Sequence, residues 1–120
     1  MTIQNRKQII EAVTDDIYQA YPDLIERYGE YGRRKTLEDN EHHLKHLETS
    51  VSLGNPQFFI DYAQWLDGIL TARGMTTALL IDNFERLLNI FSSQDDIPEE
   101  YINILSKTIE FLNSKSQNPE

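Results

Sequence analysis

The three histidines are the residues most able to do chemistry, because they lie within five consecutive positions. His42 and His46 are four residues apart, and Glu38 precedes His42 by four. On a helix this spacing places the three side chains on one face, where they can bind a divalent metal ion. A zinc-protease motif would need a glutamate at the position of His43, so the sequence gives no sign of metal-dependent proteolysis.

A helical wheel separates the three histidines by their direction. The apolar positions of residues 37–51 define one core-facing stripe. His42 points almost opposite this stripe and His46 points well away from it, whereas His43 lies at its boundary. We therefore expect an exposed pair and one boundary histidine. His43 is the candidate axial ligand if the protein binds haem.

The basic cluster Arg33-Arg34-Lys35 precedes a helix that is expected to start near Thr36. Cations beside a helix N-terminus can hold a phosphate or a carboxylate. The alternative is a corner between two helices, at which these cations pair with the acidic residues at positions 30, 38 and 39. No glycine-rich nucleotide-binding motif is present, so a nucleotide site of known type is not supported.

Aromatic residues are the third candidate feature, with one Trp, six Tyr and five Phe in the chain. They can line a cavity for an apolar or planar ligand, or they can simply form the core. Together with the basic cluster they give four candidate ligand-binding residues: Arg33, Arg34, Tyr62 and Trp65. The chain has no cysteine, so it cannot attach a bilin covalently or build a thiolate zinc site. The sequence predicts no catalytic residue and no bound cofactor.

The elements that position these residues are all helical. The 120 residues include 5 Gly and 4 Pro, and their apolar spacing follows a helical period throughout. We expect an all-α fold, a single antiparallel bundle of about five to six helices over residues 1–113, and a disordered tail at 114–120. Glycines 29 and 32 should end a short helix that starts at Pro22, and Thr36 with Asp39 should cap the next one.

Two apolar surfaces follow from the same wheels. The apolar residues of 58–70 fill an arc of roughly 160°, wider than a surface helix needs, so we expect this helix to be the most buried. Leu79 with Ile90, and Ile104 with Phe111, lie to the side of their helices' main stripes. These second edges are candidate surfaces for a protein partner.

The charge of the chain is −9, from 20 acidic and 11 basic residues. This balance opposes binding to nucleic acid or to an anionic membrane. The chain shows neither a signal peptide nor an apolar run that could cross a bilayer, so we expect a cytoplasmic protein. Residues 82–120 carry 8 acids and 3 bases, which makes the last third the more acidic surface.

One stretch of the chain reads Glu26-Arg27-Tyr28-Gly29-x-x-Gly32-Arg33-x-Lys35-x-x-Glu38-Asp39-x-x-x-His43-Leu44-x-x-Leu47, followed by Phe59-x-x-Tyr62-x-x-Trp65-Leu66 and Ala72-Arg73-Gly74. This pattern resembles a poorly characterised all-helical module of bacterial proteins. Such modules stand alone or precede ligand-binding and signalling domains, including cobalamin-binding ones. The resemblance implies a helical fold with a sensing or regulatory role. It also implies that the positions to examine for function are Arg33, Glu38, Asp39, His43, Tyr62 and Trp65. This sequence shows no cobalamin-type domain, so cofactor binding is not implied.

Two hypotheses about function follow. The first is a non-catalytic cytoplasmic regulatory or protein-interaction module of bacterial signalling, whose partner is another protein or a second copy of the chain. The second is a small-molecule, haem or metal sensor that uses the Arg33–His43 region or an aromatic-lined cavity.

Overall fold

The helical period of the sequence produces five α-helices joined by short turns. They are α1 (Arg6–Ala20), α2 (Asp23–Leu53), α3 (Pro56–Ala72), α4 (Thr77–Ser92) and α5 (Glu99–Gln117). The structure is a computed structural model that describes residues 5–117, without the side chains of residues 25, 116 and 117. Within residues 5–117 there is no strand. The predicted all-α helical bundle is confirmed.

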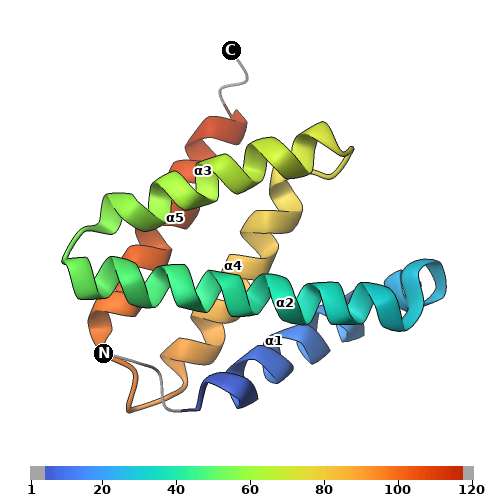
Figure 1. The fold of residues 1–120 in the computed structure, drawn as a ribbon, viewed down its shortest axis with the longest axis horizontal. Coiled ribbons are helices and arrows are strands. Elements are labelled where there is room, and N and C mark those ends of the chain that lie inside the picture. The colour runs from blue at the N-terminus through green and yellow to red at the C-terminus, as the bar shows by residue number, and fades with distance from the viewer. Residues whose placement is uncertain (1–4, 118–120) are drawn as a thin grey trace.

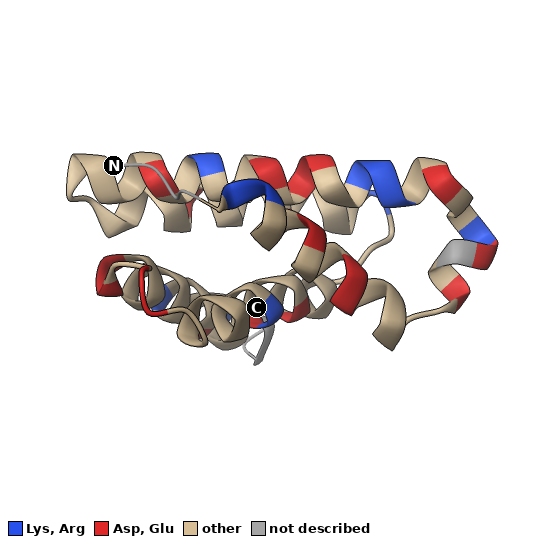
Figure 2. Cartoon of the chain, turned by 90° about the horizontal axis from the view of Figure 1, so that it is seen from below, with Lys and Arg blue, Asp and Glu red and all other residues tan. Residues whose placement is uncertain are grey.

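The helices form two layers (Figure 1). The hairpin of α2 and α3 lies over α4 and α5, and α1 packs against α2 and α4. The molecule measures 39 × 38 × 19 Å, and its shortest dimension corresponds to two helix diameters of about 10 Å each. Figure 2 shows this thin dimension, with α2 running along one layer. A residue of α3 can therefore contact neighbours on one side and face solvent on the other.

The core lies between the layers and takes apolar residues from every helix. Its largest fully buried side chains include Phe59 of α3, Phe84 and Phe91 of α4, and Tyr101 of α5. Phe59 and Phe84 join the layers, with ring centroids 5.5 Å apart. None of the described helices combines the length and apolar composition needed to cross a membrane.

Local signals in the chain set the turns at both ends of α3. Asn55 caps α3 by accepting a hydrogen bond from the Gln57 N–H, and Pro56 takes the first helical position. Gly54 ends α2 with φ at 64°, a left-handed conformation that favours glycine. Thr76 caps α4 by accepting from the Leu79 N–H. These caps fix the two turns that frame α3.

The start of α2 differs from the prediction at Gly32. Gly29 does interrupt the helix, with φ at 58° and ψ at −148°, but the helix continues through Gly32 to Leu53. A single glycine costs a helix only about 1 kcal/mol, which tertiary packing overrides. A Cβ at Gly32 would lie 2.5 Å from the Cβ of Tyr28, so this glycine allows close packing after the bend. The predicted cap is absent as well, because the Thr36 hydroxyl donates to the Gly32 carbonyl one turn earlier.

Two further expectations about helix length and burial need correction. α5 continues as a helix to Gln117, four residues past the expected end of the bundle, and residues 118–120 of the expected tail lie outside the described residues. α3 is not the most buried helix. Its buried apolar residues are Phe59, Tyr62 and Ala63, whereas α4 buries five.

Candidate functional site

The junction between α2 and α3 contains a buried polar pair. His43 Nδ1 and the Tyr62 hydroxyl share a hydrogen bond of 2.7 Å. The His43 ring is 2% exposed and lies edge-on to Phe84, with ring centroids 5.0 Å apart. Burial, and then the neighbouring His42, lower the pKa of His43 to about 3. His43 is therefore a neutral hydrogen-bonding residue of the core at physiological pH.

His46 lies next to this pair and covers it. Its ring stacks on Tyr62, with centroids 3.9 Å apart and an interplanar angle of 13°, and it also faces Phe58. Its Nδ1–H donates 2.8 Å to the His42 carbonyl. The predicted exposed pair is thus half right. His42 is exposed, but His46 is half-buried and His43 is fully buried, because α3 covers the flank of α2 that the wheel left open.

The predicted metal site is not formed. Glu38 lies 3.7 Å from Lys35, and His46 is held by its stacking and its bond to the backbone. Across residues 5–117, no group of three or more His, Asp or Glu side chains could hold a metal ion. The haem role of His43 does not fit the geometry either. Its ring lies against Tyr62 and Phe84, which leaves no open face for a planar macrocycle.

An apolar stripe runs along one side of α3. We call Phe58, Tyr62, Trp65 and Ile69 the α3 stripe, because spacings of four, three and four residues place them on one side of the helix. His46 covers its first half. From there α2 and α3 diverge (Figure 1), and Trp65 is 63% exposed. A tryptophan this exposed at the centre of an apolar stripe is typical of a contact surface.

Charged residues of both signs lie near the α3 stripe. Burial raises the pKa of Asp39 of α2. The charges of Lys35, of His42 and, least of the three, of Arg73 at the end of α3 oppose this rise. Asp39 also helps burial to raise the pKa of Tyr62. On the outer side of α3, Asp61 accepts a hydrogen bond from Gln57. The surface therefore has an aromatic centre and a rim of mixed charge.

The basic cluster lies elsewhere, near the bend of α2 (Figure 2). Arg33 donates 2.7 Å to Asp15 of α1, which is not one of the acids expected from the sequence, while Arg34 is exposed. Lys35 lies 3.7 Å from Glu38, as one of the expected pairs. Arg33 is ten residues before His43, about 15 Å along the helix. The four candidate ligand-binding residues therefore do not converge, since Tyr62 and Trp65 lie with His43.

The two candidate contact surfaces predicted beside the main apolar stripes, Leu79 with Ile90 and Ile104 with Phe111, are exposed only in part. Leu79 is 39% exposed, but Ile104 is 5% exposed and belongs to the core. The residues that hold the hairpin in place were not predicted from the sequence. Asn40 and Asn83 form two reciprocal side-chain hydrogen bonds of 2.7 and 3.1 Å that tie α2 to α4. The one sign of this contact in the sequence is that Asn40, a polar residue, lies in the apolar stripe of α2.

Comparisons with protein-family models, with curated proteins and with solved structures found no match.

Proposed function

We propose that this protein is a non-catalytic regulatory module of the bacterial cytoplasm that acts by binding protein, and that its partner at the α3 stripe is a second copy of the chain. The observation that carries the proposal is Trp65, which is 63% exposed within the α3 stripe. Tryptophan is among the residues that contribute most to protein interfaces. Its exposure is costly unless a partner covers it.

The surface is complementary to itself. If two α3 helices pack antiparallel about a two-fold axis near residue 67, residue 61 lies opposite residue 73 and residue 65 lies opposite residue 69. Asp61 then meets Arg73 of the second copy, and Trp65 meets Ile69. Opposite charges thus face each other at both ends, with apolar contact between them.

The sensor hypothesis receives less support from the geometry. Arg33 is engaged by Asp15, and His43 is enclosed by Tyr62 and Phe84. Two hollows at the surface of the described part of the chain are lined by other residues, without an aromatic side chain in either lining. A sensor that uses the Arg33–His43 region or an aromatic-lined cavity stays a prediction.

The test is the oligomeric state of the full chain, measured by sedimentation equilibrium over a wide range of protein concentration. The wild type should form a concentration-dependent dimer, and Trp65→Ser should shift the equilibrium toward monomer at least tenfold. Asp61→Lys and Arg73→Asp should each weaken the dimer, because each places like charges opposite one another. The double variant D61K/R73D should restore it.

Leu53→Ser is the matched control, because Leu53 is 61% exposed but lies outside the α3 stripe. It should leave the dimer unchanged. A wild type that is monomeric at every concentration would refute the proposal. So would a dimer that Leu53→Ser weakens as much as Trp65→Ser does.

A further inference from the structure

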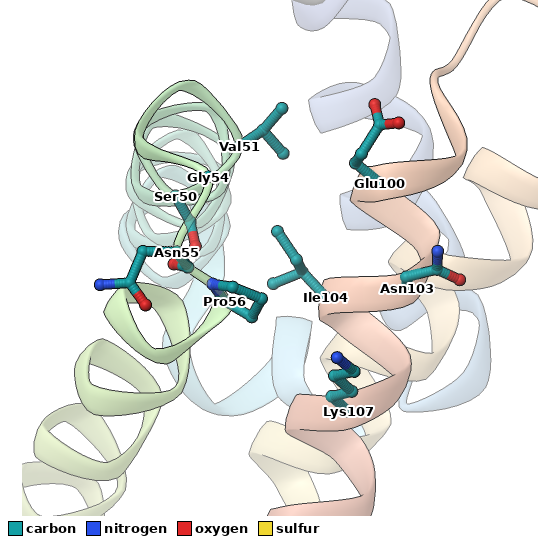
Figure 3. A pocket seen from close by; sticks show the side chains of 9 residues that line it. All are labelled: Ser50, Val51, Gly54, Asn55, Pro56, Glu100, Asn103, Ile104 and Lys107. Atoms are coloured by element: carbon teal, nitrogen blue, oxygen red, sulfur yellow. Dashed lines mark hydrogen bonds between the residues drawn. The ribbon is translucent and has the colours of Figure 1, made fainter.

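A cleft lies between the α2–α3 turn and α5, and none of the residues that line it belongs to the α3 stripe (Figure 3). It has a volume of about 220 Å³. Val51 and Pro56 form the side that belongs to the hairpin, and Ile104 of α5 points toward them across the cleft. The two polar groups of the turn are already engaged. The Ser50 hydroxyl donates to the Asn55 carbonyl at 2.6 Å, and the Asn55 side chain caps α3. The hairpin side of the cleft is therefore effectively apolar.

The α5 side of the cleft carries two opposite charges, one on each side of Ile104. Glu100 lies at one end and Lys107 at the other (Figure 3). Neither forms an ion pair with another residue in the described range 5–117. They are seven residues apart, so they share a face of the helix at a separation of about 10.5 Å, too far to neutralise each other directly. The cleft thus presents a carboxylate, an apolar centre and an ammonium in line.

We infer that this cleft binds a small zwitterion with an aliphatic side chain, that is, an aliphatic α-amino acid. Its ammonium pairs with Glu100 and its carboxylate pairs with Lys107, as charge-assisted hydrogen bonds. Its side chain contacts Val51, Pro56 and Ile104. The volume of about 220 Å³ suits a ligand of this size, since sites for drug-sized molecules start at about 300 Å³.

The line of charges explains why a zwitterion is favoured over a simple anion or cation. A single charge would satisfy one end of the cleft and be repelled by the like charge at the other end. A molecule that carries both charges satisfies both ends, and flexible side chains let Glu100 and Lys107 close on it. Both charged residues are exposed, so water screens the pairs and the dissociation constant should be millimolar.

The test titrates the full ¹⁵N-labelled chain with L-leucine and follows amide chemical shifts by NMR. Saturable shifts are expected at residues 50–56 and 100–107. Glu100→Gln and Lys107→Met should each weaken binding about three- to fivefold, the loss of one exposed charge pair. N-acetyl-leucine, which lacks the ammonium, and leucinamide, which lacks the carboxylate, should bind about three- to fivefold more weakly than leucine to the wild type.

Two matched variants serve as controls. Glu99→Gln removes the neighbouring first-turn acid of α5 without touching the cleft, and Lys45→Met removes an exposed lysine of α2. Both should leave leucine binding unchanged. The inference is overturned if leucine gives no saturable shifts, if Glu100→Gln and Lys107→Met bind it like the wild type, or if leucinamide binds as well as leucine. Trp65→Ser should keep leucine binding, which separates this test from that of the α3 stripe.

Discussion

α3 and α4 are two apolar helices of nearly equal length, 17 and 16 residues, that the fold uses in opposite ways. α4 buries Leu80, Ile81, Phe84, Leu87 and Phe91. It packs against α1, α3 and α5, and it meets α2 through side-chain contacts. α3 packs against α2, α5 and one part of α4, and leaves Trp65 exposed. Which flanks of a helix its neighbours cover, rather than its apolar content, therefore determines which helix completes the core and which retains a surface for contact.

The two helices also differ in how they use polar groups. At the α2–α3 junction the buried contacts include His43 with Tyr62, which must stay paired to avoid a desolvation cost. At the α4–α5 junction the corresponding contact is between the rings of Phe91 and Tyr101, at 6.2 Å. The stability contributed by the first junction should therefore depend on pH, and that contributed by the second should depend on the volume of its buried side chains. Three changes test this contrast.

The largest effect is expected at the α4–α5 junction. Phe91 is fully buried against Tyr101, so Phe91→Ala should lower the free energy of unfolding by about 3–5 kcal/mol through lost transfer energy and a new cavity. Urea denaturation followed by circular dichroism measures it. A loss below about 1 kcal/mol would show that the core relaxes around the cavity, and would remove the contrast with α3.

A smaller, pH-dependent effect is expected from His43. Its pKa is about 3 in the folded protein, below the ordinary value of 6.5. Below pH 6.5 the unfolded chain takes up a proton that the folded chain does not, so this contribution to stability is complete above pH 6.5 and falls as the pH drops toward 3. Between pH 7 and pH 5 the loss should be about 2 kcal/mol.

The variant His43→Leu provides the control for that pH dependence. It replaces the titrating imidazole with an apolar side chain of similar size. The part of the pH dependence of stability that belongs to His43 should therefore disappear. Denaturation at both pH values measures the difference. If the variant keeps the full loss between pH 7 and pH 5, another group is responsible and the pKa assigned to His43 is wrong.

The smallest effect is expected at Trp65. Trp65→Ala should change the free energy of unfolding of the monomer by no more than about 0.5 kcal/mol, because the side chain is 63% exposed and makes few contacts in the fold. Dilute protein, in which association is negligible, gives the cleanest measurement. A loss close to that of Phe91→Ala would mean that Trp65 belongs to the core, and the comparison of α3 with α4 would fail.

Much of the fold was predictable because its signals are local. Asn55-Pro56 and Thr76 start α3 and α4 through hydrogen bonds to groups two or three residues away, which a sequence shows directly. The candidate site was predictable only in part. Tyr62 and Trp65 were identified from one helix, but Arg73 was not, because its relation to Asp39 depends on how α3 lies against α2.

The sequence alone determined the helices, their order and the apolar side of each, since these follow from a period of 3.6 residues and from capping groups near in the chain. Only the tertiary structure decided that helix formation would continue through Gly32, that His43 would be buried against Tyr62 and that Trp65 would stay exposed. Each of these depends on which helix covers a given flank. Packing between distant segments sets that choice, and it outweighs local preferences of about 1 kcal/mol per residue.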